Sequence, residues 1–122
     1  MKADARWENQ AKNVIRFTFA GDWSWEDFYG VFDRRDPYPP DQRICFLIDI
    51  RAVTRIPSDA VLHMRRFVKL AEQVSGLIII IATSVPAVMM FRLFVSVYRS
   101  ASDKFRLVAN DEEAYASLHM PA

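Results

Sequence analysis

Glycine is scarce in this chain of 122 residues, with three in all, at Gly21, Gly30 and Gly76. Nucleotide-binding loops place several glycines between a strand and a helix, because only glycine lets backbone amides approach a phosphate closely. No two of these glycines lie close enough to share one turn. The chain therefore lacks the glycine-rich phosphate-binding turn of nucleotide-dependent enzymes.

Cysteine and histidine are also scarce. The single cysteine, Cys45, cannot form an intrachain disulfide, and its place in the apolar run Ile44–Ile48 predicts a buried, inert thiol that fits a reducing compartment. His63 and His119 fall in different predicted helices, and no pair of residues has the spacing of metal ligands. We therefore predict no metal site, no cofactor and no catalytic residue, and hence a protein that is not an enzyme.

Neither sign of charge dominates, since 16 basic residues stand against 15 acidic ones for a net charge of +1. This balance provides no field that would attract nucleic acid. The basic start around Lys2 is not followed by an apolar stretch of signal-peptide length, and no run is long and uncharged enough to cross a bilayer. We therefore expect a cytoplasmic protein with no nucleic-acid partner and no transmembrane segment.

Apolar residues make up 52% of the chain, which is enough for a core in a domain of this length. No linker or repeat divides the sequence, so residues 1–122 are expected to form a single domain. Apolar runs predict strands at 5–9, 14–20, 43–51, 77–82 and 105–109. Helical spacing and capping residues predict helices at 25–35, from Ser58 to just before Gly76, at 84–100 and at 110–119.

The resulting order, ββαβαβαβα, is typical of an α/β fold with a mixed sheet of about five strands and about four helices. Strands joined through helices are expected to run parallel, while the first two form an antiparallel hairpin. The nearly continuous apolar run Ile44–Ile48 predicts a central strand that is buried on both faces. Ser24 and Asp27 have the spacing of a capping box, and Trp23 and Phe28 that of a hydrophobic staple.

Asp49 is predicted near the carboxyl end of the central strand, where parallel sheets bind their ligands. The following segment carries Arg51, Thr54, Arg55 and Asp59, and these are the candidate contacts for a ligand or partner. One interpretation places a small apolar or anionic molecule beside Asp49 and the start of the second helix. The alternative is structural, with the carboxylate accepting hydrogen bonds from loop amides or pairing with Arg51 or Arg55.

The stretch 46–70 resembles the signature region of the STAS family, named for sulfate transporters and anti-sigma factor antagonists. Asp49 matches the aspartate that ends the family's buried strand, and Val53 and Thr54 match the loop that follows. Ser58 falls where the antagonists carry a regulatory phosphorylated serine. The resemblance implies a STAS-like fold and a regulatory module that acts by binding other proteins.

Residues 105–118 resemble the family's closing strand and last helix, so the resemblance covers nearly the whole chain. The opening hairpin resembles a STAS-like branch generally without assigned activity. The turn departs from the family pattern, since Pro57, Asp59 and Ala60 replace an aspartate, a small polar residue and a glycine. We therefore interpret Ser58 first as a helix N-cap, with phosphorylation as the alternative.

The third predicted helix is apolar around most of its circumference, because Arg92, Ser96 and Arg99 form its single polar stripe. A helix that covers one sheet face needs one apolar stripe, so a second contact is expected, either an interface or a lipid-like pocket. Burial beneath the first helix and shallow membrane contact are the alternatives. The candidate contact residues are Met89, Met90, Phe91, Phe94 and Tyr98.

Together these features predict a non-enzymatic STAS-like interaction module that forms a homodimer through its third helix. The alternative function is a small-ligand binder, with an apolar or anionic molecule held at the carboxyl end of the central strand.

Overall fold

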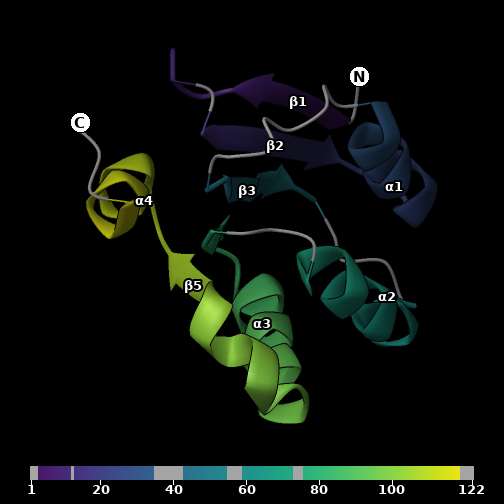
Figure 1. Ribbon diagram of the computed structural model, residues 1–122. Helices are drawn as coiled ribbons and strands as arrows, with labels where there is room; N and C mark the ends of the chain where they lie inside the picture. The colour runs from purple at the N-terminus through teal and green to yellow at the C-terminus, as the bar shows by residue number, and fades with distance from the viewer. Residues whose placement is uncertain (1–2, 12, 35–42, 55–58, 73–75, 119–122) are drawn as a thin grey trace.

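The structure is a computed structural model that describes residues 3–11, 13–34, 43–54, 59–72 and 76–118. In these segments, five strands and four α-helices follow one another in the predicted order, with a 3-10 helix before the last strand (Figure 1). The strands are β1 (Ala3–Trp7), β2 (Val14–Gly21), β3 (Cys45–Val53), β4 (Ile78–Ile81) and β5 (Phe105–Val108). The helices are α1 (Trp25–Arg34), α2 (Ala60–Glu72), α3 (Val85–Val97), the 3-10 helix η1 (Arg99–Lys104) and α4 (Asp111–Leu118).

The strands form one mixed sheet in the order β1-β2-β3-β4-β5. β1 pairs antiparallel with β2, as the predicted hairpin requires, and every later neighbour pairs parallel. β3 is the middle strand, as the apolar run in its sequence predicts. The α/β fold with a mixed five-stranded sheet, an opening hairpin and four α-helices is therefore confirmed.

Several predicted boundaries are wrong, and the pairing of neighbouring strands explains two of them. β1 lies two residues earlier than predicted, because Ala3 already pairs with Phe19 of β2. β3 begins and ends two residues later than predicted, and its later end follows from β2, which continues to Gly21 opposite Val53. α3 ends at Val97 rather than near residue 100, where the chain tightens into η1.

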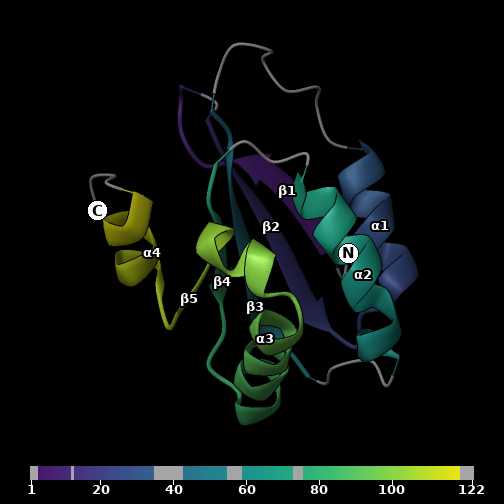
Figure 2. The same cartoon turned by 60° about the horizontal axis from the view of Figure 1, so that its bottom comes forward.

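Helices cover both faces of the sheet, with α4 on one side and α1 and α2 on the other (Figure 2). The hydrophobic core therefore consists of two clusters, one on each face of the sheet. On the side of α1, α2 and α3, Phe46 and Ile48 of β3 pack in one cluster with Phe94 of α3. On the other side, Leu47 packs with Ala114 of α4. Successive residues of β3 thus contribute to opposite clusters, as expected of a strand buried on both faces.

α1 begins at the predicted capping box. The Ser24 hydroxyl accepts a hydrogen bond from the Asp27 backbone N–H at 3.1 Å, and the Ser24 N–H donates to the Asp27 carboxylate at 3.0 Å. The rings of Trp23 and Phe28 meet across the cap, 5.9 Å apart between centroids, as a hydrophobic staple requires. This local geometry fixes Trp23 and Trp25 at the junction of β2 and α1.

Candidate functional site

An apolar pocket of about 90 Å³ lies between the sheet and the helices α1, α2 and α3. Ile48 and Ile50 of β3 and Ile80 of β4 form its floor. Ile50 and Ile80 belong to the later halves of two parallel strands, whereas Ile48 lies just before the middle of β3, so the floor extends from the middle of the sheet toward the carboxyl ends.

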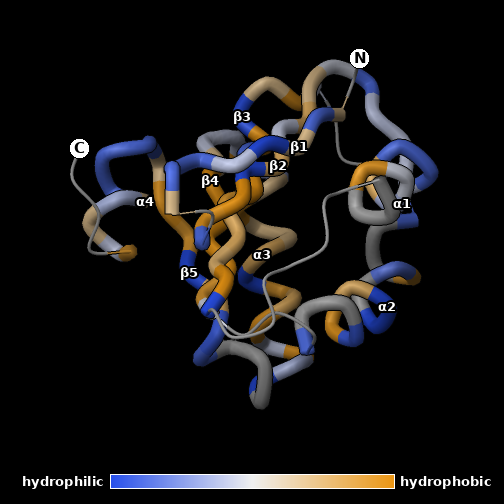
Figure 3. Tube along the Cα trace, turned by 45° about the horizontal axis from the view of Figure 1, so that its top comes forward, coloured by the Kyte–Doolittle hydropathy of each residue, from blue (hydrophilic) through white to orange (hydrophobic). Residues whose placement is uncertain are grey.

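The walls of the pocket come from the helices. Trp23, Trp25 and Phe28 form one end at the β2–α1 junction, while α2 contributes Phe67. The opposite end is built from α3 by Met90, Phe91 and Phe94. Nearly all of the lining atoms are carbon, in keeping with the largely hydrophobic colour of α3 and the inner strands in Figure 3.

α1 and α2 meet beside the tryptophan end of this pocket. The imidazole of His63 stacks on the Trp25 indole, with centroids 4.5 Å apart and planes 12° from parallel. The Tyr29 hydroxyl lies 2.9 Å from His63 Nδ1, and Asp59 Oδ2 lies 3.4 Å from His63 Nε2. Burial raises the pKa of Tyr29, so the phenol keeps its proton near neutral pH, and the tautomer of His63 decides which partner donates this hydrogen bond.

Asp49 lies on the other face of the sheet, toward α4, and is the fifth residue of the nine in β3 rather than near its end. Its Oδ2 accepts hydrogen bonds from Arg16 at 3.1 Å and from Arg51 at 2.7 Å. Arg16 also donates to both carboxylate oxygens of Glu8, at 2.9 Å each, and to Asp111 at 3.1 Å. Arg16 is 5% exposed and Asp49 is 8% exposed. The network is therefore buried, and it favours the structural interpretation of Asp49, in which the carboxylate pairs with arginine and binds no ligand.

The network keeps its carboxylates ionised. Burial alone raises the pKa of Asp49, but the hydrogen bonds from Arg51 and the charge of Arg16 outweigh it and bring the pKa below its ordinary value of 3.8. The hydrogen bond from Arg16 lowers the pKa of Glu8 from its ordinary value of 4.5, against the effect of burial. Tyr115 also donates to Glu8, and this bond raises the Tyr115 pKa. Carboxylates held this firmly in the ionised form are poor proton acceptors, which favours a structural role.

The predicted ligand loop is divided between the two faces. Arg51 joins Asp49 and Asp111 on the α4 side, whereas Asp59 contacts His63 next to α1. Thr54 is exposed, and its backbone N–H donates to the Gly21 carbonyl at 3.0 Å. The remaining candidates, Arg55 and Ser58, lie outside the described residues.

The predicted contact residues of α3 differ in how far they are buried. Phe94 is buried and belongs to the core, Met90 and Phe91 are half-buried in the pocket wall, and Tyr98 packs on Phe94 with centroids 5.6 Å apart. Met89 alone of the five is exposed. It belongs to an exposed row that sequence reasoning missed, although the i, i+4 spacing of its members is a readable signal. This α3 ridge consists of Val85, Met89, Leu93 and Val97, each 46% to 69% exposed.

The described segments contain neither a candidate metal site nor a candidate membrane-spanning helix. No group of three His, Cys, Asp or Glu side chains there converges to hold a metal ion. None of the described helices is long and apolar enough to cross a membrane. Cys45 is partly exposed rather than buried as predicted, because it is the first residue of β3. Comparison with protein-family models and with curated proteins found no match for this chain.

Proposed function

We propose that this chain is a non-catalytic binding protein whose pocket between the sheet and helices α1, α2 and α3 takes a small apolar molecule. The observation that supports this proposal is the pocket itself. Sites for small molecules are commonly concave and lined mainly by apolar and aromatic side chains, as this pocket is. This pocket of about 90 Å³ is partly open to solvent, and its carbon walls offer water no hydrogen-bond partners, so an apolar group is a favourable occupant.

Neutral apolar compounds are expected to raise the melting temperature. A ligand at ten times its dissociation constant stabilises the folded state by about 1.4 kcal/mol, which corresponds to about 5 °C in a domain of this size. The measurement is a thermal melt with benzene, toluene or pentane, accompanied by tryptophan fluorescence, since Trp23 and Trp25 line the pocket. An unchanged melting temperature with all three compounds would count against the proposal.

Two variants change the size of the pocket in opposite directions. Ala87→Leu adds a side chain at a buried residue of the pocket wall and is expected to abolish the stabilisation, whereas Phe91→Ala enlarges the pocket and is expected to favour the larger compounds. Val85→Leu places the same side chain on the exposed side of α3 and should leave the response unchanged. Loss of the response in Val85→Leu would show that the compounds do not act through the pocket.

The predicted homodimer is a second candidate function, and the α3 ridge supports it. Four exposed apolar side chains in one row on a helix are the kind of surface that associates with a partner. An isologous contact would place the α3 ridge of one copy against that of the other. This contact involves the outer side of α3, while the pocket lies on its inner side, so the two functions are compatible.

Leu93→Glu is expected to dissociate such a dimer, because a charge placed in the centre of an apolar interface is left unpaired. Leu62→Glu is the matched control, since Leu62 is 82% exposed on α2 and lies outside the α3 ridge. Sedimentation equilibrium of the two variants and the parent chain measures the effect. A parent chain that is monomeric at high protein concentration would contradict the dimer.

The proposal has four further parts. They are the STAS-like regulatory role, regulation at Ser58, the absence of catalysis and the cytoplasmic location. The intact mass of protein purified from its host tests the phosphorylation of Ser58.

A further inference from the structure

The α3 ridge lies in the positively charged part of the chain. Residues 60–104, which include α2, β4, α3 and η1, contain six basic and two acidic residues, for a net charge of +4. The remaining residues contain 10 basic and 13 acidic ones, for a net charge of −3. The overall charge of +1 therefore conceals two parts of opposite sign, and the exposed apolar row belongs to the positive one.

The ridge itself lies in a stretch of the sequence without acidic residues, which extends from Glu72 to Asp103. This stretch includes the whole of α3, whose charged residue is Arg92, and Arg99 follows at the start of η1. Both arginines are exposed. An apolar row with cations near it and no acids of its own complements a surface that combines apolar material with negative charge.

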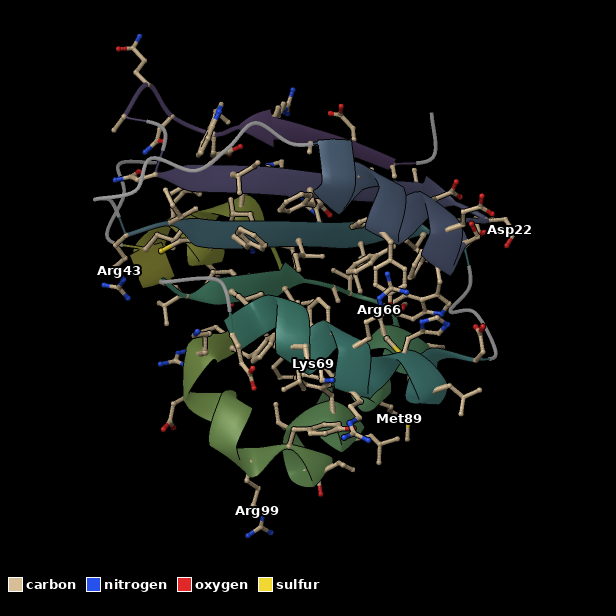
Figure 4. The ribbon with its side chains drawn as sticks, turned by 45° about the vertical axis from the view of Figure 1, so that its right-hand side comes forward. Asp22, Arg43, Arg66, Lys69, Met89 and Arg99 are labelled. Atoms are coloured by element: carbon tan, nitrogen blue, oxygen red, sulfur yellow. The ribbon has the colours of Figure 1, made fainter. Side chains whose placement is uncertain are left out.

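α3 lies where an extended surface can reach it. Figures 1 and 2 both place α3 at the outer margin of the molecule, away from β1. In Figure 4, Met89 of the ridge, Lys69 of α2 and Arg99 of η1 are seen from the same side. The ridge runs from Val85 to Val97 along the whole of α3, a length of about 18 Å. A surface parallel to the helix axis can therefore contact the ridge along its length.

We infer that the α3 ridge docks on the surface of a lipid bilayer that contains anionic lipids. The apolar side chains of the ridge enter the boundary between headgroups and acyl chains, while Arg92, Arg99 and Lys69 lie at the level of the anionic headgroups. This inference goes beyond the proposed function and does not depend on it, because the pocket lies on the inner side of α3 and the ridge on its outer side.

The same ridge cannot hold a second copy of the chain and a bilayer at once, and its charges favour the bilayer. An isologous contact would bring Arg92 and Arg99 of one copy toward those of the other, and no acidic residue between Glu72 and Asp103 compensates them. Anionic headgroups supply the missing negative charge, which strengthens binding by about fivefold for each cation near the surface. A second copy is therefore the competing occupant that the experiment has to distinguish.

Flotation with lipid vesicles tests the inference. The full chain is mixed with vesicles of phosphatidylcholine alone or of phosphatidylcholine with about 30% phosphatidylserine, and the protein that floats with each is measured. The vesicles with phosphatidylserine are expected to bind the chain about tenfold more tightly. Raising the salt concentration from about 0.1 M to about 0.5 M is expected to remove most of this preference, because the cations are exposed. Sedimentation equilibrium of the same protein without vesicles gives its oligomeric state.

Two pairs of variants separate the apolar contribution from the charged one. Leu93→Gln removes an apolar side chain from the ridge and is expected to weaken binding to both kinds of vesicle by about tenfold. Leu62→Gln is its control, since Leu62 is 82% exposed on α2 and lies outside the ridge. Arg92→Gln is expected to weaken binding to the phosphatidylserine vesicles by about fivefold and to leave binding to phosphatidylcholine unchanged. Arg43→Gln is its control, since Arg43 is exposed and precedes β3 (Figure 4).

The possible outcomes are distinct. A chain that floats with neither kind of vesicle, or equally well with both, would overturn the inference. Control variants that lose as much binding as Leu93→Gln and Arg92→Gln would overturn it as well, because the α3 ridge would then not be the contact. A chain that is dimeric and does not float would assign the ridge to a second copy. The thermal response to apolar compounds is measured without vesicles, so the pocket is judged separately.

Discussion

Replacing Arg16 with glutamine is expected to lower the free energy of unfolding by about 3–5 kcal/mol, because it leaves buried carboxylates without their cation. Arg16 is 5% exposed and holds Glu8 through two hydrogen bonds and Asp49 through a third. Urea unfolding followed by circular dichroism measures the change. Arg43→Gln is the matched control, since Arg43 is exposed, and its effect should stay within about 0.5 kcal/mol.

A combined variant separates the loss of the cation from the loss of packing. Arg16→Met together with Glu8→Gln and Asp49→Asn removes the arginine charge and the two most buried carboxylate charges of the network. Because the combined variant leaves neither Glu8 nor Asp49 as a buried carboxylate charge without the Arg16 cation, it is expected to be more stable than Arg16→Gln alone. An Arg16→Gln variant within 1 kcal/mol of the parent chain would show that the network is not the stabilising element argued above.

The same network determines how stability depends on pH. The pKa values of Glu8 and Asp49 are lower in the folded state than their ordinary values of 4.5 and 3.8, so the unfolded chain binds more protons in this range. The contribution to stability is complete above the unfolded pKa values and is lost as the pH falls through the folded ones. Arg16→Gln is expected to flatten this acid dependence below about pH 5.

The order of the elements could be predicted because each element carries its own local signal. Ser24 and Asp27 mark the start of α1 by themselves, and the apolar run Ile44–Ile48 marks β3 without reference to any partner. The strand ends could not be predicted in the same way. They depend on the length of the neighbouring strand, as the pairing of Gly21 with Val53 shows.

The position of Asp49 illustrates what local signals omit. Asp49 and Arg51 end the apolar run in the sequence, so a polar strand end was the natural prediction. The strand runs two residues beyond its predicted end at Arg51, so Asp49 lies in its middle, where Arg16 lies on the same face and compensates its charge. Arg16 is 33 residues away along the chain, and no pattern within one element specifies that the two will meet.

The contacts between α1 and α2 were missed for the same reason. Helical spacing within α2 could not show that α1 lies beside His63. The stacking of His63 on Trp25 and the approach of Arg66 to Tyr29 exist only once α1 and α2 are packed side by side. The apolar floor of the pocket, by contrast, could be predicted, because its isoleucines belong to apolar runs that the sequence marks as buried strands.

Gly76→Ala is expected to destabilise the fold by about 3 kcal/mol, the upper end of the range for inserting a methyl group into packed structure. A Cβ atom at this position would lie 2.5 Å from Cys45 Sγ and 2.6 Å from the Ile44 carbonyl oxygen. The carbonyl cannot simply move away, because it accepts the hydrogen bond from the Gly76 N–H at 2.7 Å. The close approach of these two backbone segments at the start of β3 therefore requires glycine.

Two further variants test this reason with urea unfolding. Gly30→Ala has no heavy atom within 4 Å of the added Cβ and lies inside α1, so it is expected to stabilise the fold by about 0.5–1 kcal/mol. Adding Cys45→Ala to Gly76→Ala removes the contact with sulfur but leaves the clash with the Ile44 carbonyl, so it should recover only part of the loss. Full recovery would show that the sulfur, and not the backbone, imposes the requirement for glycine.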